Sequence, residues 1–199
     1  MQFRIALALG AMLAAVAPLQ PAAAEGRFPQ QLSEADQARL RDFAAIRGAA
    51  IASAQQGDPA EVVGLEALLK PEPVQLPAAV LAGEWRCRVL LLGGTLPLTV
   101  YTDFRCRITD DAAGLRLQKL TGSQRTAGTF YDIGEARLGY AGAVTMNDDP
   151  PLRYGQQPEN DQVGYLVPIN PHWLRLEIPS ALQDGQLQII EFRRLTPPA

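Results

Sequence analysis

The sequence predicts a mainly β protein, an eight-stranded antiparallel barrel preceded by two short helices. Two observations support this. From Gly83 onward the apolar residues recur with a period of two, whereas before Gly83 they recur at helical spacing. Eight short strand-like runs then follow one another without a gap long enough for a helix. Regularly spaced short strands joined by turns are typical of an up-and-down barrel, with a sandwich as the alternative.

The helical lead is predicted over residues 25–82. Ser33 followed by Asp36 resembles a capping box, and a weak apolar stripe continues to a stop at Gly57. Asp58-Pro59 is a stronger start signal, because an Asp cap precedes a Pro at the first helical position. Prolines from Pro71 onward end this second helix and favour an extended linker to the barrel domain at 83–199.

The eight strands are delimited by clusters of Gly, Pro, Asn and Asp. The predicted strands are 84–92, 97–108, 115–120, 126–132, 135–145, 162–167, 173–178 and 186–194. The last run does not alternate cleanly, because Leu187 and Ile189 share one parity and Ile190 and Phe192 the other. An extra residue would restore the alternation, so a β-bulge is predicted near 189–190.

Residues 1–24 have the organisation of a secretory signal peptide. Arg4 gives a positive n-region, residues 5–19 are apolar, and Ala22-Ala23-Ala24 supplies small residues for cleavage. A membrane anchor is the alternative, but the run is shorter than the ~20 apolar residues that span a bilayer. We therefore expect cleavage after Ala24, a mature protein that begins at Glu25, and a periplasmic or secreted location.

Composition limits the partners of the mature chain. Without residues 1–24 it carries 17 basic and 21 acidic residues, which argues against a nucleic-acid partner. No later stretch is apolar enough to span a membrane. About 175 residues suffice for one ordinary core that buries roughly 70% of the unfolded surface. The sequence thus predicts one compact domain with an appended helical segment.

A short motif at each end of the strand series resembles the lipocalin and wider calycin pattern. Gly83-Glu84-Trp85 opens the first strand, and Arg193-Arg194 closes the last. The resemblance implies that Trp85 lies across the closed end of the barrel and that one of the two arginines stacks on its indole ring. It implies a lipocalin-like fold and a pocket, and no particular ligand.

A second resemblance covers most of the mature chain. The stretches at 83–88, 104–108, 117–125, 147–151 and 163–165 resemble a family of exported proteins from Gram-negative bacteria, a domain of unknown function. This resemblance implies the compartment and the extent of the domain. It supplies no catalytic residue.

Cys87 and Cys106 occupy the same place in two Arg-Cys-Arg triplets. A hairpin centred near Leu96–Pro97 would set them face to face on the inner side of the first two strands. Two cysteines in an exported chain are expected to form a disulfide. Closing a loop of about 20 residues should stabilise the folded state by roughly 3 kcal/mol. Free thiols, a redox pair or metal ligands are the alternatives. The spacing is far from Cys-x-x-Cys, and the chain has one histidine.

The most unusual polar stretch is the turn at 121–125. Backbone N–H groups here, together with a fixed positive charge, could hold a carboxylate or phosphate; an ordinary hairpin turn is the alternative. Tyrosines from later strands could line the same cavity or simply pack. The candidate ligand-binding residues are Ser123, Gln124, Arg125, Tyr131, Tyr140 and Tyr165.

No residue pattern indicates catalysis. A triad would require His172 to meet Ser123, whose surroundings do not match a hydrolase elbow, so His172 is interpreted as a turn residue. The paired acids at 110–111 and 148–149 are interpreted as solvated turn residues rather than catalytic or calcium-binding groups. We expect no cofactor and no metal. The leading hypothesis is a binding module for a small apolar or weakly anionic ligand. The alternatives are a structural or protein-interaction domain of the cell envelope and, third, an enzyme of unrecognised type.

Overall fold

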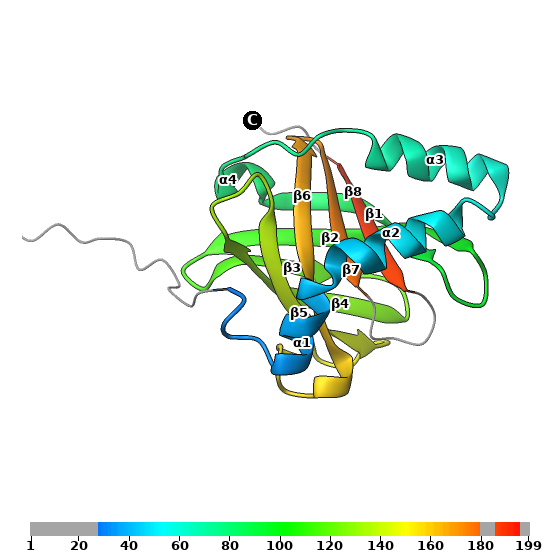
Figure 1. Ribbon diagram of the computed structural model, residues 1–199. Helices are drawn as coiled ribbons and strands as arrows, with labels where there is room; N and C mark the ends of the chain where they lie inside the picture. The colour runs from blue at the N-terminus through cyan, green and yellow to red at the C-terminus, as the bar shows by residue number, and fades with distance from the viewer. Residues whose placement is uncertain (1–27, 180–185, 196–199) are drawn as a thin grey trace, which may run out of the picture.

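The computed structural model of the protein describes residues 28–179 and 186–195. Eight antiparallel strands form a closed barrel in sequence order, with β8 pairing back onto β1, which confirms the predicted fold class (Figure 1). The predicted signal peptide, 1–24, lies outside the described residues. The strands are β1 (Gly83–Leu92), β2 (Leu98–Asp111), β3 (Gly114–Lys119), β4 (Gln124–Asp132), β5 (Leu138–Met146), β6 (Asp161–Asn170), β7 (Trp173–Pro179) and β8 (Leu187–Arg194).

The helical lead contains more helices than the two predicted. They are α1 (Glu34–Arg41), α2 (Phe43–Ala54), α3 (Pro59–Leu69) and the single turn α4 (Ala78–Leu81). Both predicted start signals act as caps: Ser33 accepts the Asp36 N–H, and Asp58 accepts the Ala60 N–H. The first predicted helix is divided at Asp42, whose ψ of 2° lies outside the helical range. In the part of the chain that is described, no helix combines the length and the apolar character required to cross a membrane.

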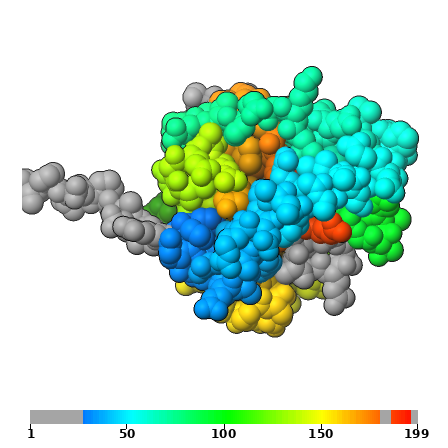
Figure 2. Space-filling model, in the orientation of Figure 1, coloured from blue at the N-terminus to red at the C-terminus, as the bar shows by residue number. Residues whose placement is uncertain are grey.

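The lead packs on the outside of the barrel. α1 and α2 cross one face, and α3 lies beside them (Figure 1); the space-filling view shows them as a continuous cover (Figure 2). Leu65 and Leu68 of α3 belong to one apolar cluster with outward residues of the barrel, among them Leu90 and Ile189. These strands are therefore buried on both faces.

Double burial explains the broken alternation of β8, and the predicted bulge is wrong. β8 pairs with β1 in unbroken register from Leu187, opposite Leu92, to Arg194, opposite Trp85. Its register with β7 is also unbroken, from Leu187 to Arg193. Ile190 and Phe192 face the interior, while Leu187 and Ile189 face the helices. A strand covered on both sides has no reason to alternate between apolar and polar residues.

The interior of the barrel is filled over much of its length. Trp85, Phe130, Tyr140 and Phe192 pack there with aliphatic side chains of β6, β7 and β8. Tyr140 is fully buried, and a Cβ on either Gly128 or Gly142 would lie within 2.6 Å of its side chain. Two facing positions are thus occupied by glycines because the tyrosine side chain fills the space between them.

A disulfide joins Cys87 to Cys106, as the sequence predicts, with 6.1 Å between the Cα atoms. It lies on the inner face of β1 and β2, in one cluster with Trp85 and beside Phe104. The predicted register is wrong, because Trp85 is opposite Cys106 and Cys87 is opposite Phe104. The two cysteines are therefore diagonal neighbours. A register shift between Cys87 and Val89 distinguishes this hairpin from the regular one assumed from the sequence.

One end of the barrel is closed by the N-terminal end of β1 and the C-terminal end of β8. The guanidinium of Arg194 lies over Trp85, with its Cζ 4.1 Å from the ring centroid. Its Nη1 donates to Ala82 O at 2.9 Å and its Nε to Pro171 O at 2.8 Å. Gly83 has a φ of 140°, and a Cβ there would lie 2.5 Å from the guanidinium. The glycine of the motif is required by this close approach.

Candidate functional site

The opposite, open end of the barrel contains the interior cavity. The closed end carries Trp85, whereas the β1–β2, β3–β4 and β5–β6 connections lie at the open end because the strands alternate in direction. The cavity has a volume of about 200 Å³. Its lining combines apolar and polar side chains and consists of Val89, Leu91, Tyr101, Phe104, Lys119, Ser123, Gln124, Thr126, Val144 and Gln188.

Lys119 is the only cationic side chain among these lining residues. It ends β3, where Leu115 and Leu117 on the same face pack into the core, and only 4% of its surface is exposed. Its Nζ donates to Thr121 O at 2.9 Å and to Gln124 O at 2.7 Å, and it lies 3.7 Å from the centre of the Phe104 ring. Within the described residues it forms no ion pair.

Burial is the main reason that the pKa of Lys119 falls to about 8, and the nearby charge of Arg125 lowers it further. Removing an ammonium group from water disfavours its charged form. Two carbonyl dipoles and one aromatic face partly replace the lost hydration. The ammonium therefore remains charged at neutral pH, and no carboxylate of residues 28–179 or 186–195 pairs with it.

Two more buried polar atoms face the barrel interior. The hydroxyl of Tyr140 and the Oε1 of Gln162 make no hydrogen bond in the described parts of the chain. Gln162 is opposite Gly142 across β5 and β6, and a Cβ on Gly142 would lie 2.3 Å from the Tyr140 hydroxyl. Burial raises the pKa of Tyr140 far above its ordinary value. The hydroxyl is thus a neutral donor and acceptor within the barrel.

The six predicted ligand-binding residues do not line one cavity. Ser123 and Gln124 line the interior cavity. Tyr140 is inside the barrel but belongs to its packed core. The other three point outward, because each alternates with an inward residue on its strand.

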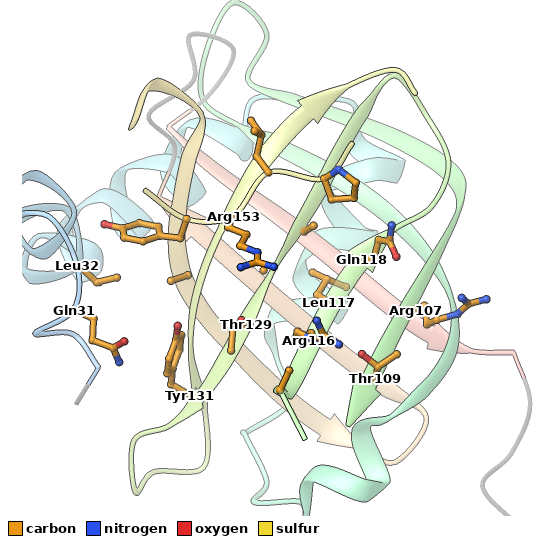
Figure 3. A pocket seen from close by; sticks show the side chains of 17 residues that line it. Gln31, Leu32, Arg107, Thr109, Arg116, Leu117, Gln118, Thr129, Tyr131 and Arg153 are labelled. Carbon is orange, nitrogen blue, oxygen red and sulfur yellow. The ribbon is translucent and has the colours of Figure 1, made fainter. Parts of the chain in front are cut away.

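The three outward residues have separate surroundings. Arg125 forms an ion pair with Asp148 at 2.8 Å and donates to Gly122 O, so it closes its own turn. Tyr165 packs edge-on against Phe43 of α2 and lies under the guanidinium of Arg137. Tyr131 stacks on Phe28 and lines a groove on the outer surface of the barrel (Figure 3). The hypothesis of a shared pocket for these tyrosines and Arg125 is wrong.

The turn residues considered for catalysis lie far apart. Ser123 is in the β3–β4 connection at the open end, and His172 is in the β6–β7 turn at the closed end. The His172 N–H donates to the Asn170 side chain, as in an ordinary Asx turn. Among the residues that the structure describes, no three His, Cys, Asp or Glu side chains gather in a way that could hold a metal ion.

Sequence reasoning missed Lys119, although a signal was present. Leu115, Leu117 and Lys119 share one parity in a six-residue strand, so an inward Leu115 implies an inward lysine. A lysine at the end of a strand is usually assigned to the surface, because its long stem can reach water. Here the β3–β4 turn folds over the ammonium and keeps it inside.

Comparisons with known proteins identify a family without an assigned activity. The family model described as "Domain of unknown function (DUF4893)" matches residues 29–192, which span both the helical lead and the barrel. The sequence resemblance to an uncharacterised family agrees with this match. No curated protein matches the sequence. No solved structure matches it either.

Proposed function

The chain belongs to the DUF4893 family, and we propose that it is an exported binding module that holds one small, mainly apolar carboxylate in the open half of its barrel. The observation that carries this proposal is Lys119, a buried ammonium that lies beside an interior cavity and has no carboxylate partner among the residues the structure describes. The proposal assigns the protein a binding role and no catalytic step.

The charge of Lys119 favours an anionic ligand group. A buried charge is costly unless it is paired, and a carboxylate within reach would supply the missing partner. Carbonyl oxygens of Thr121 and Gln124 already orient the ammonium. Because the ammonium is already held in place, binding of a ligand carboxylate would cost little side-chain entropy.

The size and lining of the cavity limit the rest of the ligand. A volume of about 200 Å³ corresponds to the liquid volume of about seven water molecules. Val89, Leu91, Phe104 and Val144 give an apolar wall, and Thr126 and Gln188 add neutral hydrogen-bonding groups. A short aliphatic or small aromatic acid fits this combination.

A structural or protein-interaction domain of the cell envelope is the competing function. The observation that favours it is the filled interior beside Trp85, where aromatic and aliphatic side chains leave the closed half packed. In that case Lys119 serves only to fasten the β3–β4 turn. The two functions differ in whether the pKa of Lys119 responds to a carboxylate.

The chain has two lysines, Lys70 and Lys119, which permits a direct test. Lysine labelled with ¹³C at Cε gives one NMR signal for each residue, and the pH dependence of each signal gives its pKa. We expect a pKa near 8 for Lys119 in the free protein. Saturation with butanoate, hexanoate or benzoate should raise it, because an opposite charge favours the ammonium.

Lys70 is the internal control, since it is exposed at the end of α3 and should not respond. Lys119→Met should abolish binding of the acid in the interior cavity, whereas Lys70→Met should leave it unchanged. Native mass spectrometry of protein purified from its own cell envelope would add the identity of any retained molecule. An unchanged Lys119 pKa with all three acids, together with no retained molecule, would overturn the proposal in favour of the interaction domain.

A further inference from the structure

We propose that the groove on the outer surface of β2 to β5 is a second binding site, independent of the interior cavity, for a small organic anion held by Arg116 and Arg153. Figure 3 shows these two side chains in the middle of the groove, with Arg107 at its edge. The volume of the groove is about 710 Å³, within the range of small-molecule sites.

Small residues form the floor of the groove. The outward positions of β4 and β5 here are Ala127, Thr129 and Ala141, which leave a depression where no helix covers the barrel. On the opposite side of the barrel the outward residues are large and apolar and meet α2 and α3. The floor of the groove therefore follows from the small outward residues of β4 and β5.

The charge of the lining departs from that of the whole chain. The chain has a net charge of −3, yet the groove is lined by three arginines and by no acidic residue. Arg107 is paired with Glu84. Arg116 is paired with Asp111 at 2.6 Å, and both side chains are nearly half exposed, so that ion pair contributes little and can exchange for a ligand.

Arg153 forms no ion pair in the described parts of the chain, and its N–H donates to Gln156 Oε1 at 2.6 Å. The neighbouring Tyr154 hydroxyl donates to Asp36 Oδ2 at 2.5 Å and accepts the Ser33 N–H at 2.8 Å. The Gly155 N–H donates to Asp161 Oδ1 at 2.9 Å. The capping box of α1 thus also fixes the wall of the groove and directs Arg153 over its floor.

Arginine on a fixed backbone beside an apolar floor suits a planar or branched anion. A guanidinium can donate two parallel hydrogen bonds to a carboxylate or a phosphate. Tyr131 and Tyr154 supply aromatic surface at one side. A carboxylate or phosphate on a small aromatic or aliphatic body has the chemistry that this groove recognises.

Strand β4 separates the groove from the interior cavity. Thr126 faces inward and lines the cavity, whereas Ala127 and Thr129 face outward and line the groove. The two sites can therefore be tested separately. Loss of one does not predict loss of the other.

The test uses the mature chain from residue 25 with its disulfide formed, and phenyl phosphate and benzoate as probes. Binding is followed by titration calorimetry and by backbone amide NMR shifts. We expect shifts at Gln118 and Thr129, and affinities about tenfold weaker for Arg153→Gln and for Arg116→Gln, which corresponds to about 1.4 kcal/mol each. The ratio of the two probe affinities shows whether phosphate or carboxylate is preferred.

Arg86→Gln is the matched control, because Arg86 is exposed on β1, lines no part of the groove and forms no ion pair among the described residues. It should change the affinity less than twofold, and Lys119→Met should leave phenyl phosphate binding intact. An equal loss in Arg86→Gln would indicate unspecific charge attraction. That result, unchanged binding in both groove variants, or no binding of either probe would overturn the inference.

Discussion

Two cations near the barrel axis are stabilised by different residues at its two ends. Arg194 stacks on Trp85 and donates to backbone carbonyls at the closed end. Lys119 is held by two carbonyls and the Phe104 ring beside the interior cavity. Arginine is weakly hydrated and suits a structural stack, whereas a lysine shifts its pKa readily when it is buried. The arginine therefore closes one end of the barrel, and the lysine lies at the other end beside the interior cavity.

The buried ammonium of Lys119 should make stability depend on pH. Below pH 8 the residue is charged in both the folded and the unfolded protein, and the folded state bears the full desolvation cost. Between pH 8 and 10.5 the folded state releases the proton first, so rising pH favours folding. The gain should be about 1–3 kcal/mol in the free energy of unfolding.

Urea unfolding of the wild type and of Lys119→Met across this range measures the effect. The difference between them isolates Lys119, because the tyrosines and other groups that titrate near pH 10 are common to both proteins. A constant difference from pH 7.5 to 10.5 would contradict a lowered pKa. Lys70→Met should show the pH dependence of the wild type.

At the scale of single strands, the alternation of β4 and β6 decides which predicted site residues meet. Phe130 and Tyr131 are adjacent aromatics, and sequence alone does not tell which of them faces the core. Tyr165 beside Leu166 presents the same ambiguity, and here both faces are buried. For Arg125, which precedes the inward-facing Thr126, the alternation of the strand alone predicts an outward side chain. The polar turn at 121–125 predicts a site at the residues that surround Lys119, but it does not indicate the lysine itself.

The fold was more predictable than the site because period-two patterning and turn residues are local. All eight strands and both helix caps follow from such signals. The covering of β8 by the helical lead is a tertiary effect, which is why the bulge that the sequence predicts near 189–190 is wrong. The groove arises likewise from segments distant in sequence, since Gln31 and Arg153 line it together only in the folded chain.

The β1–β2 hairpin depends on its disulfide in a measurable way. The diagonal bond between Cys87 and Cys106 crosses the inner face next to Trp85. We expect Cys87→Ala/Cys106→Ala to lose about 2–4 kcal/mol of unfolding free energy. The barrel should persist, because β1 also pairs with β8 and β2 with β3.

Denaturant unfolding with and without dithiothreitol tests this expectation. Reductant should destabilise the wild type toward the level of the double variant and should leave the double variant unchanged. Thiol labelling of denatured, unreduced protein should modify neither cysteine. Full labelling there would show that the bond is absent from the purified protein.

In the whole molecule, the helical lead covers one side of the barrel, and the groove lies on another side. The helical lead covers one side (Figure 2), where β1 and β8 present apolar residues to it. The outer face of β2 to β5 carries the arginine-lined groove instead. The family match includes the lead, so lead and barrel form one unit of sequence. The lead contributes Gln31 and Leu32 to the lining of the groove, and its Ser33 and Asp36 hold the Tyr154 side chain that lines the groove beside them.

The predicted signal peptide should affect the stability of the barrel, because export to an oxidising compartment allows the disulfide to form. In a bacterial host, the full chain should be recovered from the envelope fraction with Glu25 as its first residue and the cysteines oxidised, because disulfides persist in that compartment. A variant without residues 2–24 should remain in the cytosol with both thiols reduced and should be less stable by about 2–4 kcal/mol. Mass spectrometry of the intact proteins, with and without thiol alkylation, distinguishes the two species. Recovery of the full chain with Met1 intact and both cysteines alkylated would contradict export and would place the protein in the cytosol.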